Sequence, residues 1–93
     1  MADPLIVEVV ELSESVWTGE ARQVIVRTPG GEMGILSGHV AIAGVLEAGR
    51  VVIDPIDGQR IEGRVDGGVV SVDSNRVTIV ADHYREGAEA ASA

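Results

Sequence analysis

The sequence predicts an all-β domain, built as a sandwich or a barrel of short strands. Apolar and polar residues alternate over much of the chain, as in residues 60–65 (RIEGRV), which is typical of strands with one packed and one wet face. Twelve glycines indicate frequent turns. The 93 residues suffice for one domain, and because phenylalanine is absent its core must come from valine, isoleucine, leucine and alanine.

The first part of the chain predicts strands of uneven length. Residues 5–12 form a β-branched run that suits a largely buried strand. Residues 13–15 (SES) interrupt this run, and residues 16–17 (VW) are expected to add a short edge piece. Residues 22–28 alternate again and predict a further strand, after which residues 29–31 (PGG) turn the chain.

Residues 32–49 are the least strand-like stretch. Their apolar residues show no sustained alternation and are interspersed with glycines, so we expect two short strands around a loop. Apolar residues are unusually dense between positions 32 and 46. This segment either folds inward as core or forms an exposed apolar patch for a partner.

The second half predicts a meander of three hairpins. Its strands and the turns between them alternate along the chain: turn 54–58, strand 60–65, turn 66–68, strand 69–73, turn 73–75 and strand 76–81. We expect one domain over residues 1–84. Residues 85–93 are expected to be a tail, frayed or disordered, because so short an alanine-rich segment cannot hold a helix alone.

Charge and composition exclude several classes of function. The net charge is −8 and every basic residue is arginine, which argues against binding nucleic acid or anionic lipid. Without lysine there is no attachment point for biotin or lipoate, and without cysteine there is no thiol chemistry. Nowhere do 18 apolar residues run together, so we expect no insertion into lipid.

The candidate chemical motifs are weak. Ser37 and His39 lie two residues apart and lack the surroundings of a nucleophile elbow. A metal site would need His39 and His83 to converge with a carboxylate such as Asp82. Residues 29–34 have the glycines of a phosphate cradle, but Glu32 would repel phosphate and no lysine follows. We therefore expect no catalytic residues, cofactor, metal or small-molecule ligand.

Several segments, in order, resemble the N-terminal domain of the epsilon subunit of F-type ATP synthases. The resemblance covers about residues 5–83 and rests on these segments: 19–21 (GEA), 27–29 (RTP), 31–39 (GEMGILSGH), 46–49 (LEAG), 65–68 (VDGG) and 76–82 (RVTIVAD). It implies a flattened β-sandwich of about ten short strands. Relatives usually continue into a two-helix domain that can restrain ATP hydrolysis and in some members binds ATP, whereas this sequence stops soon after Tyr84. We therefore expect this polypeptide to lack an inhibitory arm and an ATP site.

The resemblance also implies a function and partners. In the family this domain is a non-catalytic part of the central stalk, held between the gamma subunit and the c ring, and it couples ion-driven rotation to ATP synthesis. The expected location is peripheral, on the cytoplasmic face of the bacterial plasma membrane. The alternative is a small β-barrel carrier or adaptor domain that binds a protein partner, which the absence of lysine disfavours in its carrier form.

The resemblance further assigns the partner-binding residues. Glu32 is the candidate for a polar contact with the c ring and His39 for a contact with gamma. The other candidates belong to the same loop and its flanks, and its apolar members would be partly core and partly docking surface: Gly34, Ile35, Leu36, Gly38, Val40 and Ile42. Ser37 and Ala41 stand where the family commonly has proline, so we expect a less rigid loop.

Overall fold

The computed structural model describes residues 3–12 and 14–86, which form nine strands, and it confirms the all-β sandwich. In the described part the strands number nine rather than about ten. In chain order they are β1 (Leu5–Glu11), β2 (Glu14–Thr28), β3 (Gly31–Leu36), β4 (Ile42–Leu46), β5 (Gly49–Pro55), β6 (Ile61–Val65), β7 (Gly68–Asp73), β8 (Arg76–Ala81) and β9 (Tyr84–Glu86).

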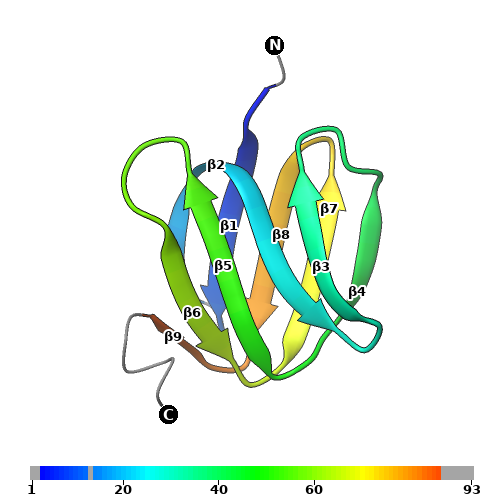
Figure 1. Ribbon diagram of the computed structural model, residues 1–93. Coiled ribbons are helices and arrows are strands. Elements are labelled where there is room, and N and C mark those ends of the chain that lie inside the picture. The colour runs from blue at the N-terminus through cyan, green and yellow to red at the C-terminus, as the bar shows by residue number, and fades with distance from the viewer. Residues whose placement is uncertain (1–2, 13, 87–93) are drawn as a thin grey trace.

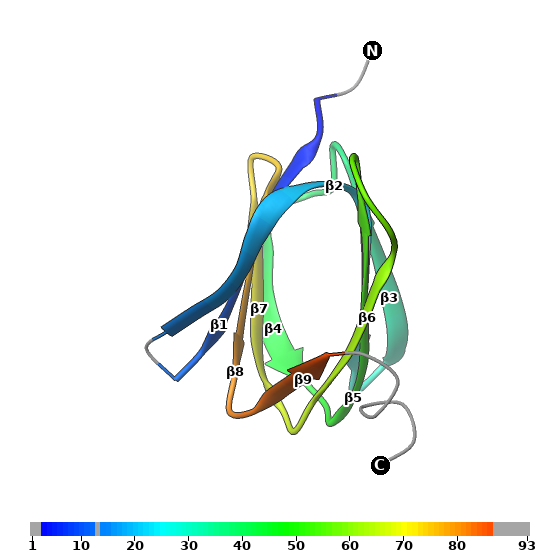
Figure 2. The same ribbon diagram turned by 90° about the vertical axis from the view of Figure 1, so that its left-hand side faces the viewer.

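A single sheet folds over on itself at β2 to give two layers (Figures 1 and 2). The first layer has the order β4-β7-β8-β1 and ends on the first half of β2. The second layer contains the rest of β2, which pairs with β3 on one side and with β5 on the other, followed by β6 and β9. The two layers therefore share one strand.

The predicted interruption after residue 12 is present, because β1 ends at Glu11 and β2 begins at Glu14. The prediction of a short edge piece at residues 16–17 was wrong, because these residues belong to β2, which runs unbroken for 15 residues. Its first half pairs with β1, where Val9 faces Trp17 and Val10 faces Ser15. Val16 is therefore the extra residue of a β-bulge, which shifts the alternation by one position and imitates the end of a strand in the sequence. A second irregularity between Ala21 and Gln23 falls where β2 passes between layers.

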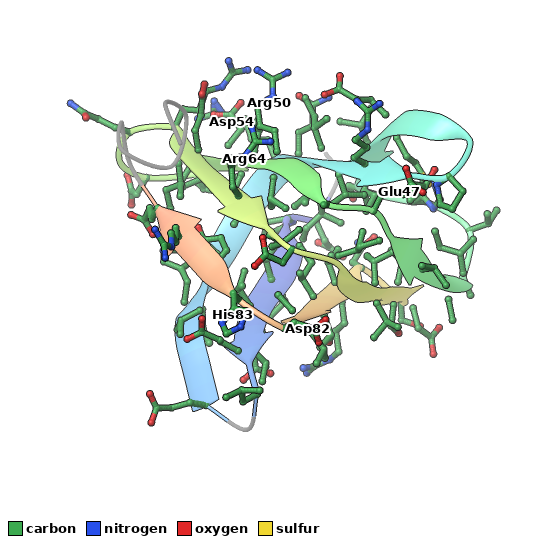
Figure 3. All side chains as sticks on the ribbon, turned by 90° about the horizontal axis from the view of Figure 1, so that it is seen from below. Glu47, Arg50, Asp54, Arg64, Asp82 and His83 are labelled. Carbon is green, nitrogen blue, oxygen red and sulfur yellow. The ribbon has the colours of Figure 1, made fainter. Side chains whose placement is uncertain are left out.

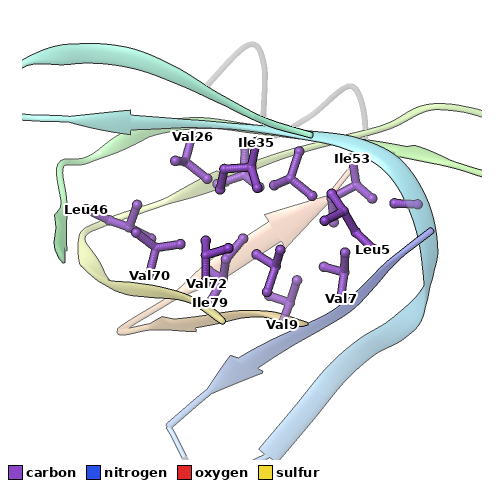
Figure 4. Close-up of a cluster of buried hydrophobic side chains, with 14 of the residues drawn as sticks. Leu5, Val7, Val9, Val26, Ile35, Leu46, Ile53, Val70, Val72 and Ile79 are labelled. Atoms are coloured by element: carbon purple, nitrogen blue, oxygen red, sulfur yellow. The ribbon is translucent and has the colours of Figure 1, made fainter. Parts of the chain in front are cut away.

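The core lies between the layers and is entirely apolar among the described residues (Figure 4). Alternate residues of the strands point inward, as the two-residue period requires. The largest fully buried side chains are Leu5, Val7, Val9, Val24, Val26, Ile35, Val51, Ile53, Val70, Val72, Val77 and Ile79. Two short strands around a loop, β3 and β4, do form within residues 32–49, as predicted.

The predicted meander was wrong at its middle turn. Residues 54–58 and 73–75 do turn hairpins, between β5 and β6 and between β7 and β8. Residues 66–68 instead carry the chain from β6 in the second layer to β7 in the first. Gly67 (φ +121°) and Gly68 (φ +149°) provide this change of direction, and the same residue types would serve a hairpin.

Strand β9 closes the second layer by pairing with β6. It includes Arg85 and Glu86, which the sequence assigned to the tail, whereas residues 87–93 of that predicted tail lie outside the described residues. The backbone N–H of Tyr84 donates to the Glu11 carboxylate at 2.9 Å, so the end of β1 anchors the start of β9. Burial first, and then the neighbouring Glu86 carboxylate, raises the pKa of the Tyr84 phenol.

We predict that Gly68→Ala strongly destabilises the fold. A Cβ at position 68 would lie 2.0 Å from the Val80 carbonyl oxygen, and the backbone is already in a region that favours glycine. Urea unfolding should show a loss of about 3 kcal/mol or more in the free energy of unfolding. Gly44→Ala is the matched control, because a Cβ there meets nothing within 4 Å. Equal losses in the two variants would contradict the role of Gly68.

We predict that the protein loses stability at alkaline pH through Tyr84. The raised pKa of the folded state means that its stabilising effect is complete below the unfolded pKa of about 10 and declines as the pH rises above it. The chain has one tyrosine, no lysine and no cysteine, so tyrosinate absorbance reports this group alone. Urea unfolding at about pH 8 and about pH 11 should show a smaller loss for Tyr84→Phe than for the parent. An equal loss would contradict the prediction.

Candidate partner interface

The loop between β3 and β4 is tied to two other segments at one end of the sandwich. The Gly38 N–H donates to the Asn75 side-chain carbonyl at 2.8 Å, and the Asn75 amide donates to the Ser37 hydroxyl at 3.2 Å. The Ser37 hydroxyl in turn donates to the backbone carbonyl of Asp3. Asn75 has φ +63°, a conformation that asparagine tolerates, and its own carbonyl accepts the Ile6 N–H at 2.8 Å. One asparagine thus joins the loop to β1.

Ser37 has a structural role that proline could not perform. Its hydroxyl lies between the Asn75 amide and the Asp3 carbonyl, where it donates one hydrogen bond and accepts another. A proline side chain has no polar atom for either contact. The position where the resemblance expects proline is therefore held here by side-chain hydrogen bonds.

The residues predicted to bind partners do not form one patch. Glu32 lies at the start of β3, next to the β2–β3 turn, whereas the loop follows the opposite end of β3 (Figure 1). At the usual rise of a strand, the Cα atoms of Glu32 and Leu36 are about 13 Å apart. The Glu32 carboxylate lies 3.3 Å from an Arg50 guanidinium nitrogen, with the carboxylate side chain 47% exposed. The Glu32 carboxylate is thus exposed at one end of the molecule, and the loop lies at the other end.

The apolar candidates divide between core and surface, as the resemblance implies. Ile35 is fully buried and Ile42 is half-buried against the core, whereas Leu36 is 56% exposed and Val40 71% exposed. Gly34 and Gly38 are exposed, and His39 is half-buried with Nδ1 2.8 Å from the Val40 carbonyl oxygen. The exposed apolar surface of this loop therefore comes mainly from Leu36 and Val40.

An exposed row of valines on the first layer was missed at the sequence level. Val45 faces Val69, Val69 faces Val80, and Val80 faces Val10, on four adjacent strands. Their side chains point away from the core, and Val45, Val69 and Val80 are 61%, 48% and 36% exposed. We call these four residues the valine band; at the usual strand spacing it spans about 14 Å. The four valines come from separate segments of the sequence, and only the strand register brings them together.

The described residues bring no metal-binding group together. His39 lies beside the β7–β8 turn and His83 follows the far end of β8, so the two histidines are separated by the length of that strand. No group of three histidine, aspartate or glutamate side chains within the described ranges could hold a metal ion. A hollow at the bend of β2, lined by Trp17, Glu20 and Ile56 among others, contains none of the predicted partner-binding residues. No helix in the described part is long and apolar enough to cross a membrane.

The fold and its surfaces define a class of protein. It is a small β-sandwich module whose exposed apolar band and end loop suit contacts with other proteins. The family described as "ATP synthase, Delta/Epsilon chain, beta-sandwich domain" matches residues 4–87. The chain belongs to this family.

Curated relatives agree with this assignment. An ATP synthase epsilon chain of Streptomyces avermitilis is 40% identical over 82 residues, covering 88% of this chain and 66% of the relative. One of Micrococcus luteus is 43% identical over 86 residues, covering 92% of this chain and 94% of the relative. The chain thus spans about two thirds of the first relative and nearly all of the second.

Solved structures agree on the fold. A chain of the mitochondrial ATP synthase of Euglena gracilis, in a structure of OSCP, F1 and the c-ring, superposes with a TM-score of 0.84 at 22% identity, over 89% of this chain and 53% of that one. A chain from the central stalk and c-ring of the Tetrahymena thermophila mitochondrial enzyme gives a TM-score of 0.73 at 15% identity, over 89% of this chain and 66% of that one. At these identities the likeness concerns the fold alone.

We predict that Asn75→Gly loosens the loop without unfolding the domain. Glycine keeps the positive φ of position 75 but removes both side-chain hydrogen bonds to the loop. Hydrogen exchange of the Gly38 amide should accelerate by about tenfold, the effect of losing one net hydrogen bond. Ser74→Gly is the control, because Ser74 also has positive φ and, within the described residues, its hydroxyl bonds only to Asp73. Equal acceleration in both variants would contradict the prediction.

Proposed function

We propose that this chain is a non-catalytic subunit of the central stalk of an F-type ATP synthase, linking the gamma subunit to the c ring. Membership of the delta/epsilon family carries this proposal. Central-stalk and c-ring structures among the solved neighbours support it. In this role the chain turns with its partners, so that ion flow through the ring drives ATP synthesis in the catalytic head. Its location is then peripheral, on the cytoplasmic face of a bacterial plasma membrane.

The gamma subunit is proposed to bind along β4 and the strands beside it. The loop with Leu36, His39 and Val40 leads directly into β4, and β4 contributes Val45 to the valine band. Loop and band are therefore connected along one edge strand of the first layer. Burying exposed valines against a partner is favourable by about 25 cal/mol for each Å² of apolar surface removed from water. This contact is proposed to hold the domain on the stalk.

The c ring is proposed to contact the opposite end, through Glu32. Its carboxylate is half-exposed beside Arg50, at the β2–β3 turn and away from the loop. A carboxylate in this setting suits a polar contact, since its desolvation cost is small. The separation of the two candidate contacts suits a link between two different partners.

The sandwich suits a part that must transmit torque. β1 is an interior strand of the first layer, where it pairs with β8 on one side and with β2 on the other. β2 then continues into the second layer. A load applied to one layer is therefore carried to the other through backbone hydrogen bonds and a continuous chain. No step of bond chemistry is required of the domain in this role.

We predict that Val69→Asp weakens binding to gamma. A charge in the middle of the valine band would be desolvated on docking, and loss of an interface anchor should lower affinity by about tenfold or more in a titration with a gamma-containing head. Ile56→Asp is the control, because Ile56 is 40% exposed and lies beside the bend of β2, away from the band. Equal weakening, or no binding of the parent to gamma, would contradict the proposal.

We predict that Glu32→Arg weakens attachment to the c ring and leaves the fold intact. The substitution reverses a half-exposed charge and abolishes the pair with Arg50, a surface ion pair that contributes at most about 1 kcal/mol to stability. In a reconstituted complex, ATP-driven proton pumping should fall relative to ATP hydrolysis. Glu20→Arg, an equal charge change on exposed β2, serves as the control. Unchanged coupling in Glu32→Arg would remove Glu32 from the contact.

A further inference from the structure

The arginines of this acidic protein are concentrated on one layer. The net charge is −8, yet six of the seven arginines lie on or next to strands of the second layer or the bend of β2 leading into it, and only Arg76 lies on the first layer. Four of the six share one level of the sheet: Arg27 on β2, Arg50 on β5, Arg64 on β6 and Arg85 on β9. We call these four residues the arginine row. All four are exposed.

The strand register makes this row continuous. Arg50 faces Arg64 directly, and Arg64 faces Arg85 directly. On the other side, Arg27 faces Glu32 across β2 and β3, and Glu32 reaches over β2 to Arg50 at 3.3 Å. Figure 3 shows Arg50 and Arg64 side by side on the outer side of the layer. At about 4.8 Å per strand, the four arginines span about 14 Å.

Folding alone does not account for the row. Like charges that face each other directly across strands are destabilising, and the row contains two such pairs in succession. Glu32 compensates Arg50, but within the described residues no carboxylate lies within ion-pair distance of Arg27, Arg64 or Arg85. Glu62 and Asp54 are the nearest acidic positions along β6 and β5. The arrangement therefore costs stability, and among the described residues three of its guanidinium groups have no carboxylate partner.

We propose that the arginine row binds an acidic segment of another protein. Guanidinium groups bind carboxylates in a bidentate manner, and glutamates spaced three and four residues apart on a helix repeat every 5 to 6 Å or so, close to the strand spacing. The row lies on an exposed sheet face, and the hollow described above lies elsewhere, at the bend of β2. The net charge of −8 opposes docking on extended polyanions such as a duplex or a bilayer, because these also face the acidic remainder of the surface. A short acidic segment contacts only the arginine row and is repelled less.

This inference does not depend on the proposed gamma contact, but the row adjoins the proposed c-ring contact, because Glu32 pairs with Arg50. The valine band lies on the outer face of the first layer and the arginine row on the outer face of the second, so each surface can bind or fail to bind independently. Loss of the acidic segment would leave gamma binding unchanged. Loss of gamma binding would leave the acidic segment in place.

The test is a titration of the full chain with a helical peptide of about 20 residues that carries glutamate on one face, at low salt. Arg64→Gln should weaken binding by about fivefold, and Arg76→Gln, an exposed arginine of the first layer, should leave it unchanged. Amide shifts on binding should map to β5, β6 and β9. Replacement of the peptide's glutamates by glutamine should abolish binding.

A stability measurement separates binding from a structural role. Arg64→Gln removes two facing like-charge pairs, so its melting temperature should equal or exceed that of the parent. A lower melting temperature would overturn the proposal, because the row would then serve the fold. Equal weakening by Arg76→Gln would also overturn it, as would tighter binding to phosphatidylglycerol vesicles or duplex DNA than to the acidic peptide.

Discussion

The continuity of β2 is the constraint on which the rest of the structure depends. One strand of 15 residues pairs with β1 in the first layer and with β3 and β5 in the second. Both layers inherit their register from it, and the inward positions of each are fixed by where β2 bends. A one-residue slip would turn every side chain of the affected strands to the other face, exposing the valine core. The irregularities near Val16 and after Ala21 give the strand its bend without such a slip.

The shared strand also separates the two outer faces. Because the layers lie back to back around an apolar core, the valine band and the arginine row face in opposite directions. The two ends of the sandwich are separated as well: Glu32 at the start of β3 lies at one end, and the Asn75-bound loop that follows β3 lies at the other. A small domain thereby presents surfaces of different chemistry, and none of its described polar side chains is buried in the core. The candidate contacts are separated by the fold itself rather than by any added segment.

The sequence predicts where most strands lie, but it does not predict which strands lie next to each other. Alternation locates β6, β7 and β8 closely, since each has one packed face. It cannot distinguish a hairpin from a crossing between layers, because Gly67 and Gly68 are suitable for both. The bulge at Val16 shifts the alternation by one position inside β2, so the sequence pattern suggests that a strand ends there. The resemblance drew attention to the loop, whereas the valine band and the arginine row depend on register between strands distant in sequence and had no signal within any one segment.

The edges of the layers give a separate physical argument about where a partner is needed. An exposed edge strand invites unwanted pairing unless charge or distortion protects it. The other edge segments are protected: β3 carries Glu32, β9 carries Arg85 and Glu86, and the first half of β2 carries Glu14 and Glu20. Among the described strands, β4 is an edge without a charged residue, and its Val45 is 61% exposed. An edge without charged residues is open to pairing with another chain, which is an independent reason to expect the proposed partner along β4.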